Sequence, residues 1–144
     1  MQYSIREVSE MTGIPASTLR YYDREGLLPF LRRTRSGYRS FGEVDLATLQ
    51  VVECLKDTGM SIEDMRRFSR WAREGDSTLH ERRQMFLERR EAVKAQIERM
   101  RKMLAIIEHK CEYYRLAEEA GTESHLQGKV EIPYSEEFRS GGIR

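Results

Sequence analysis

The chain has 144 residues, of which 39% are hydrophobic and 34% are charged, and its formal net charge is +1. This composition is poor in apolar residues for a globular domain and is typical of long, solvent-exposed helices. No apolar run reaches the length of a membrane span and the two cysteines lie far apart without a secretory segment, so we expect a cytoplasmic protein without a membrane partner or a disulfide framework.

The first 75 residues predict a compact set of short helices, at about 5–11, 15–26, 44–58 and 62–73. A Ser or Thr followed three residues later by an acid can cap a helix, and this pattern begins at Ser4, Ser40, Ser61 and Thr78. The first two helices are joined by the turn "TGIP", in which Pro15 can occupy the first turn of the second helix. Two helices joined in this way predict a helix-turn-helix.

The segment "LLPFLRRTRSGYRSF" predicts a two-stranded hairpin with arginines near its tip. Residues 32–39, "RRTRSGYR", hold four arginines and no acid, a pattern that suits a polyanionic partner. A basic hairpin that follows a helix-turn-helix is typical of a wing, and the combination is more specific than either part alone.

Residues 78 to about 117 contain neither proline nor glycine and predict one long helix. Its apolar positions follow alternating steps of four and three and form a heptad seam: Val93, Ile97, Met100, Leu104, Ile107, Cys111 and Tyr114. Forty helical residues span about 60 Å, and nothing else in the chain is long enough to cover this stripe. We therefore expect a homodimer joined by a coiled coil, with burial against residues 1–75 as the alternative.

The predicted domains are a DNA-binding domain at 1–75, a coiled-coil dimerisation helix at 76–118 and a short polar tail at 119–144 that is partly disordered.

The DNA-binding assignment depends on the helix "STLRYYDREGLL", which carries hydroxyl, guanidinium and phenol donors on one arc: Ser17, Thr18, Arg20, Tyr21 and Arg24. Leu19 and Tyr22 form a second face that can be buried. Such donors match phosphates and base edges in the major groove, whereas a solvated polar face is the alternative.

These residues resemble the MerR family of transcription regulators, most specifically in "LRYYDREGLL" and "GYRSF", and the resemblance covers about residues 3–118. It implies a mainly α fold, with a winged helix-turn-helix DNA-binding domain followed by a long antiparallel coiled-coil dimerisation helix. It also implies that a homodimer binds double-stranded promoter DNA with a long spacer. Such a dimer activates by bending and untwisting the spacer, so that RNA polymerase engages both promoter elements.

The resemblance also implies which residues meet DNA. Arg20 and Tyr21 belong to the helix that reads DNA. Contacts with the DNA backbone are implied for the wing at Tyr38 and Arg39 and for the end of the third helix at Lys56; Arg33 and Arg35 lie in the same wing.

Cys54 is the candidate sensor. It borders an apolar helix face, where a free cysteine is usually a small core residue, and a reactive thiolate needs positive charge nearby. The segment "CLKDTGMSIEDM", with "GDSTLHERRQMFLERREAV" and "HKCEYYR", resembles the aldehyde-responsive NmlR/AdhR-like branch, in which the cysteine at this place is the proposed electrophile target. This resemblance implies a response to reactive aldehydes, other electrophiles or thiol oxidation.

Other signals stay open. Metal-responsive members of the family resemble one another in a pair of cysteines just after the coiled coil, but here Cys111 is alone and position 119 is Glu119. His109 and Cys111 lie about 200° apart on a helix and cannot bind the same ion, so a metal site would need cysteines from two subunits. We expect no metal and no cofactor. A small ligand held between the coil and the DNA-binding domain is a further alternative, although the tail is too short to build a ligand-binding domain.

A protein of another class, an architectural coiled-coil protein that binds DNA without controlling a promoter, is the remaining alternative. Uniform affinity for any duplex would distinguish it from a regulator. An enzyme is not expected, because the three histidines are scattered and neither paired carboxylates nor a phosphate-binding glycine loop marks a cleft.

Overall fold

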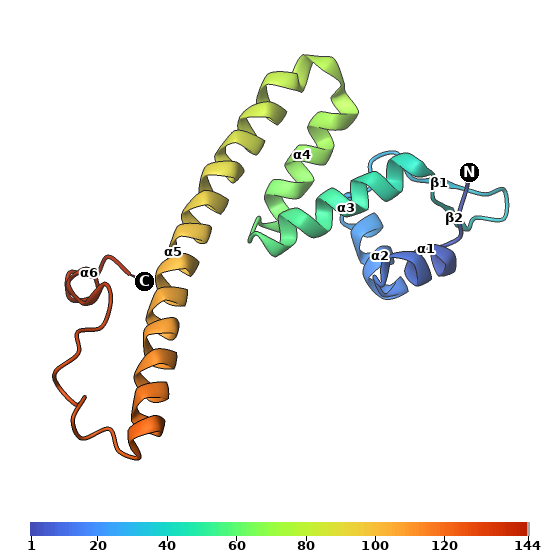
Figure 1. The fold of residues 1–144 in the computed structure, drawn as a ribbon. Coiled ribbons are helices and arrows are strands. Elements are labelled where there is room, and N and C mark those ends of the chain that lie inside the picture. The colour runs from blue at the N-terminus through green and yellow to red at the C-terminus, as the bar shows by residue number, and fades with distance from the viewer. Residues whose placement is uncertain (144) are drawn as a thin grey trace. The chain divides into compact units, whose positions relative to one another are not determined.

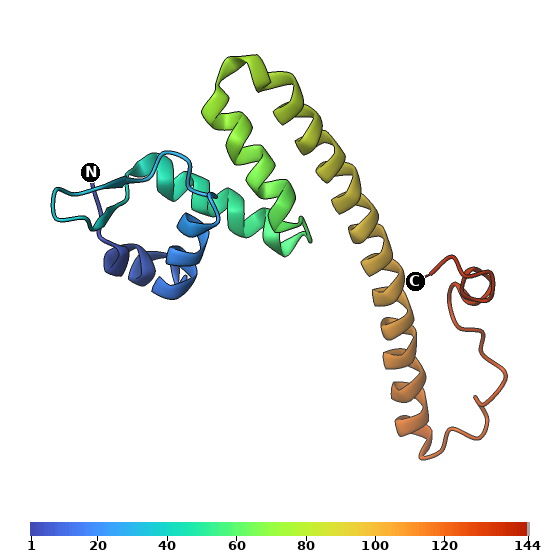
Figure 2. The same cartoon turned by 180° about the vertical axis from the view of Figure 1, so that it is seen from behind.

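The computed structural model describes residues 1–143 and is mainly helical, as Figures 1 and 2 show from opposite sides. Its elements are α1 (Ile5–Thr12), α2 (Ala16–Arg24), β1 (Arg32–Arg33), β2 (Arg39–Ser40), α3 (Glu43–Asp57), α4 (Ile62–Glu74), the 3₁₀ turn η1 (Asp76–Thr78), α5 (Leu79–Ala120) and α6 (Ser135–Arg139). The strands pair antiparallel, with Arg32 opposite Ser40 and Arg33 opposite Arg39. The predicted fold class, short helices with a small hairpin followed by a long helix, is confirmed.

The chain divides into two compact units, Met1–Arg89 and Arg90–Arg144, and α5 contributes to both. The predicted division at 75 and 118 stays a prediction. The expected disorder at the end of the tail includes Arg144, which lies outside the described residues. Within residues 1–143, no helix combines the length and the apolar character that crossing a membrane requires.

The start of α1 follows the predicted capping box. The Ser4 hydroxyl accepts a hydrogen bond from the Glu7 amide at 3.3 Å, and the Glu7 carboxylate accepts one from the Ser4 amide at 2.7 Å. Gly13 ends the helix with a φ of +74°, a left-handed conformation that favours glycine. The short turn that follows leads into α2, so the predicted helix-turn-helix connection is present.

Two predicted caps are wrong. At α3 the residue before the helix that acts as its N-cap is Gly42 rather than Ser40, and the Gly42 amide donates to the Asp45 carboxylate at 2.8 Å. Thr78 is buried in η1, and its hydroxyl donates to two backbone carbonyls at the end of α4, at 2.6 and 2.8 Å. Thr78 therefore satisfies carbonyls at the end of one helix instead of amides at the start of the next.

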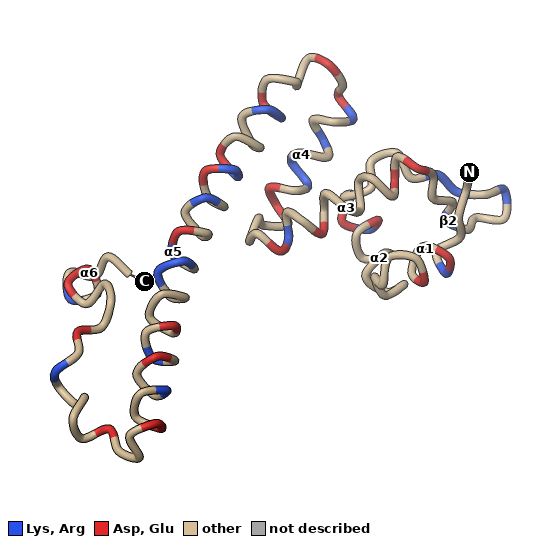
Figure 3. The backbone as a smooth tube through the Cα atoms, in the orientation of Figure 1, with Lys and Arg blue, Asp and Glu red and all other residues tan. Residues whose placement is uncertain are grey.

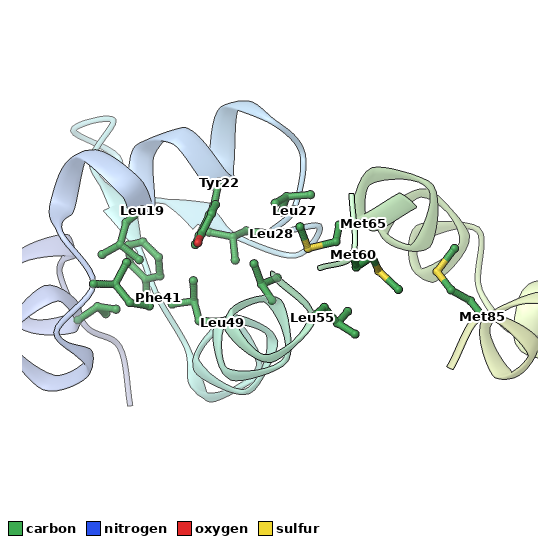
Figure 4. Packing of buried hydrophobic residues seen from close by; sticks show 13 residues of the cluster. Leu19, Tyr22, Leu27, Leu28, Phe41, Leu49, Leu55, Met60, Met65 and Met85 are labelled. Carbon is green, nitrogen blue, oxygen red and sulfur yellow. The ribbon is translucent and has the colours of Figure 1, made fainter. Parts of the chain in front are cut away.

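The core of the first unit fixes α2 by its apolar face. Figure 4 shows Leu19 and Tyr22 of α2 packed near Phe41 and Leu49, and all four are essentially inaccessible to solvent. Burying a large apolar side chain contributes about 1.5–3 kcal/mol to stability. Because one face of α2 is held in this way, the opposite face is presented to solvent.

In the second unit, the tail folds back on α5. The Lys102 ammonium donates to the Glu137 carboxylate at 2.5 Å and lies 5.5 Å from the centre of the Tyr134 ring. Near the end of α5, the Tyr113 hydroxyl donates to the Glu123 carboxylate at 3.0 Å. The tail therefore contains a short helix, α6, that is linked to α5 by an ion pair.

Candidate nucleic-acid interface

The solvent-facing side of α2 carries the predicted donors. All of them are exposed except Thr18, which is half-buried; the exposed ones are Ser17, Arg20, Tyr21 and Arg24. This exposure follows from the packing of Leu19 and Tyr22 into the core on the other side of the helix. The helix therefore offers one row of hydroxyl, guanidinium and phenol groups to a partner rich in hydrogen-bond acceptors.

The hairpin is a closed and basic turn. The Thr34 amide donates to the Tyr38 carbonyl at 2.7 Å, and the Gly37 amide donates to the Thr34 carbonyl at 2.9 Å. Gly37 has a φ of +85°, which a residue with a side chain adopts only with strain. Arg33 adds a hydrogen bond from Nη1 to the Gly37 carbonyl at 2.8 Å. The basic residues of the hairpin, blue on the backbone trace of Figure 3, are thus carried on an ordered turn.

Two sets of contacts attach the hairpin to the helices. Arg39 Nε donates to Asp23 Oδ2 of α2 at 2.7 Å, and Arg33 Nη2 lies 3.6 Å from the same oxygen. At the base of the hairpin, Tyr3 and Phe41 form a β-bridge with two N–H···O bonds of 2.8 and 2.9 Å. The position of the hairpin relative to α1 and α2 is therefore set by both backbone and side-chain bonds.

A hollow of about 310 Å³ lies where α1, α2 and the hairpin meet. It brings together predicted DNA-binding residues from two elements, and its walls are Ser4, Ile5, Arg20, Arg33, Gly37, Tyr38 and Arg39. Guanidinium groups and a phenol around one depression match the charge and the acceptor oxygens of a backbone phosphate. Arg35 and Lys56, two other predicted DNA-binding residues, are exposed but do not line this hollow.

Lys56 belongs to a hydrogen-bonded group between α2 and α3. Its ammonium donates to the Tyr22 hydroxyl at 3.1 Å and lies 3.3 Å from the Glu53 carboxylate, and the Tyr22 hydroxyl donates to Glu53 at 2.5 Å. The hydrogen bond with Tyr22 raises the pKa of Lys56. Burial, followed by the bond to Glu53, raises the pKa of Tyr22. The phenol therefore stays protonated and the ammonium stays charged at neutral pH.

Tyr22→Phe is expected to lower the free energy of unfolding by about 1 kcal/mol, because one buried hydroxyl and its hydrogen bonds are lost. Tyr21→Phe is the matched control, since its exposed hydroxyl has no hydrogen-bond partner within residues 1–143. Urea unfolding of both variants measures the difference. Equal stability of the two variants would show that the bonds between Tyr22, Glu53 and Lys56 do not stabilise the fold.

Cys54 is exposed on α3, so the alternative role of a small residue in the core of the protomer is wrong. It directly follows Glu53, which accepts the hydrogen bond from Tyr22 of α2. Cys111 is exposed on α5 and, like Cys54, forms no disulfide. Among residues 1–143, no cluster of three or more His, Cys, Asp or Glu side chains is arranged to hold a metal ion.

Asp23 and Glu53 are the site residues that sequence reasoning missed. Each bonds to a residue far along the chain, 16 positions away for Asp23 and Arg39 and 31 positions away for Glu53 and Tyr22. The one signal in the sequence was the presence of an acid, Asp23, within a helix face that otherwise carries donors.

Comparisons with known proteins agree with this geometry. Residues 3–71 match the family described as MerR HTH family regulatory protein, and residues 46–110 match the family described as MerR, DNA binding. An uncharacterized HTH-type transcriptional regulator of Haemophilus influenzae is 40% identical over 122 residues, which are 85% of this chain and 90% of the relative. The HTH-type transcriptional regulator AdhR of Bacillus subtilis is 34% identical over 88 residues, 61% of this chain and 63% of AdhR.

Among solved structures, the chain is similar to HiNmlR, described as a MerR family regulator lacking the sensor domain and bound to promoter DNA. The TM-score is 0.81 at 39% identity, over 87% of this chain and 99% of that one. These relatives are transcription regulators and not enzymes.

Proposed function

Because this chain belongs to the MerR family of helix-turn-helix regulatory proteins and is a DNA-binding transcription regulator, we propose that it binds a long-spacer promoter as a homodimer and activates transcription when Cys54 reacts with an aldehyde or another electrophile. The observation that carries the electrophile response is the exposure of Cys54 on α3, next in sequence to Glu53, whose carboxylate accepts a hydrogen bond from Tyr22 of α2. The similarity to AdhR and HiNmlR supports the same branch of the family.

In the proposed complex, α2 enters the major groove and the hairpin lies on the DNA backbone, as is usual for a helix-turn-helix with a wing. The residues proposed to meet DNA are Ser17, Thr18, Arg20 and Tyr21 of α2, Arg33, Arg35, Tyr38 and Arg39 of the hairpin, and Lys56 of α3. The hollow between α2 and the hairpin supports this assignment, because four of these residues line it. The crystal structure of the similar regulator HiNmlR on promoter DNA supports the same class of partner.

The exposed seam of α5 supports the homodimer. The tail of the same chain packs on the face that includes Lys102, which lies about 200° around the helix from Met100 and Leu104 of the seam. Val93 at the start of the seam is half-buried, but the large seam residues after it stay between 47% and 64% exposed: Ile97, Met100, Leu104, Ile107 and Tyr114. A second copy of α5 would bury this stripe, at about 1.5–3 kcal/mol for each large side chain.

The proposed reaction with formaldehyde is an addition. The Cys54 sulfur attacks the carbonyl carbon, the C=O π electrons move to oxygen, and that oxygen takes up the proton that the thiol gives up. The product is a hydroxymethyl thioether, and no oxidant or leaving group is needed. Because Cys54 follows Glu53 directly on α3, the added group can disturb the hydrogen bond that Tyr22 donates to Glu53 and shift α2 relative to α3.

Alkylation rates test whether Cys54 is the reactive thiol. We expect iodoacetamide to label Cys54 of the dimer at least about tenfold faster than Cys111, because a seam thiol reacts only when the coiled coil opens. Peptide mass spectrometry over a time course measures both rates, with Cys54→Ser and Cys111→Ser assigning the peptides. Faster labelling of Cys111 would contradict both the seam and the sensor assignment.

A small apolar effector is the second candidate, and one observation favours it. A hollow of about 370 Å³ lies between α3, α4 and the first turns of α5, within the first unit. Its wall is mainly apolar, and it includes Phe68 and Phe86 together with the buried residue Ser69. Small-molecule sites have this size and character. A response through this hollow would persist in the Cys54→Ser variant.

A further inference from the structure

Asp23 is an acid in the middle of the proposed DNA-binding surface. It lies on α2 between the exposed residues Tyr21 and Arg24, and its side chain is only 23% exposed because two arginines of the hairpin cover it. Arg39 Nε donates to Asp23 Oδ2 at 2.7 Å, and Arg33 Nη2 lies 3.6 Å from this oxygen. The carboxylate thus joins the helix to both strands of the hairpin.

A carboxylate at this place does not attract DNA. It repels phosphates, so Coulomb's law alone predicts that its removal strengthens DNA binding. Any favourable contribution of Asp23 to DNA binding must therefore come from what it holds in place.

Arg39 has a second role besides its proposed contact with the DNA backbone. Its side chain is 17% exposed and already bonded to Asp23, whereas Tyr38 beside it is 74% exposed. The strands of the hairpin are only two residues long, and an isolated two-stranded hairpin is marginally stable in water. The Tyr3–Phe41 bridge holds only the base of the hairpin, so without the bond to Asp23 the rest of the hairpin would lose conformational freedom on binding DNA and affinity would fall.

We propose that Asp23 is a positioning residue that fixes the hairpin against α2 and so sets the spacing between the helix in the major groove and the hairpin on the DNA backbone. Arg39 acts as its partner, and Arg33 is the second contact. This inference rests on the proposed function, because it concerns how the same surface fits DNA. Its consequence is that removing a negative charge weakens the binding of a polyanion.

Asp23→Asn tests whether removing this negative charge weakens DNA binding, because the variant keeps the shape of the side chain and removes the charge. The probe is a duplex operator that the wild-type protein selects from a random pool. We expect about tenfold weaker operator binding at fixed salt, since the hairpin must be ordered when it binds. Hydroxyl-radical footprinting should lose the protection of the backbone next to the hairpin and retain that along the major groove.

Glu10→Gln is the matched control. Glu10 is an exposed acid of α1, paired with Arg6 at 2.9 Å, so the variant removes the same charge from the same unit without touching the hairpin. We expect it to bind the operator as tightly as the wild type or slightly more tightly. Arg39→Lys is the second variant, because it keeps the positive charge and loses the planar guanidinium; we expect the same loss of protection at the hairpin.

The outcomes separate the two proposals. Failure of the wild type to select any duplex would overturn the proposed function itself. If the wild type selects an operator but Asp23→Asn binds it equally or more tightly with full protection at the hairpin, Asp23 is not a positioning residue. If Asp23→Asn shows no thermal unfolding transition, the variant is not folded and the footprint of Arg39→Lys is used instead. Unchanged protection next to the hairpin in Arg39→Lys overturns the proposal.

Discussion

A single glutamate in the seam, Leu104→Glu, is expected to abolish operator binding. In the proposed homodimer the substitution occurs twice, so two leucines that the interface would bury are lost, at about 1.5–3 kcal/mol each, and two carboxylates enter an apolar interface. Loss of about 5 kcal/mol of dimer stability corresponds to a dissociation constant several thousandfold higher. Sedimentation analysis should find monomers at micromolar concentration, and operator affinity should fall more than about 100-fold.

Ala95→Glu is the control for the seam variant. Ala95 is exposed on α5, about 200° around the helix from Ile97 of the seam. A glutamate at this position should leave both the dimer and operator binding intact. A dimer that persists in Leu104→Glu, or equal damage from Ala95→Glu, would show that the seam is not the dimer interface.

Arg20→Ala is expected to have the next largest effect, a loss of about 1–3 kcal/mol, or about 5- to 150-fold in operator affinity. Arg20 is exposed on α2 and lines the hollow shared with the hairpin, so it can reach either a base edge or a phosphate. If Arg20 contacts a base, its loss relaxes the sequence preference at one position of the operator. If it contacts a phosphate, its loss lowers the slope of log affinity against log salt concentration by about one. Titration of the operator at several salt concentrations measures both.

Arg99→Ala serves as the charge-matched control for Arg20→Ala. Arg99 is exposed on α5 in the second unit and carries the same guanidinium. Its removal should change operator affinity by less than about twofold, because Arg99 is not one of the proposed DNA contacts and salt screens a charge that makes no direct contact. An Arg20→Ala variant that binds no more weakly than Arg99→Ala would contradict the assignment of α2 as the reading helix.

Local features of the fold could be predicted from the sequence because their causes are local. The capping box at Ser4 depends on residues three positions apart, and the long helix depends on a proline- and glycine-free run with heptad spacing. The same reasoning was wrong for Thr78, because spacing does not show whether a hydroxyl meets the helix behind it or the helix ahead of it.

The ion pairs of the site could not be predicted, because they join elements distant in sequence. The bond from Arg39 to Asp23 exists only once the hairpin lies against α2, and the bond from Tyr22 to Glu53 exists only once α3 packs on α2. The exposure of Cys54 could not be predicted from the sequence either. It stands at the border of an apolar helix face, next to the buried residue Leu55, where one neighbouring helix decides whether a side chain is covered.

Transcription in vitro from the proposed long-spacer promoter, with and without formaldehyde, decides whether Cys54 is the sensor. The comparison is between the wild type and Cys54→Ser, with Cys111→Ser as the control for loss of a thiol. We expect formaldehyde to raise transcription with the wild type and with Cys111→Ser, and to leave Cys54→Ser at its basal level. An equal response of wild type and Cys54→Ser, or no response of either, would contradict it and direct attention to the apolar hollow between α3, α4 and α5.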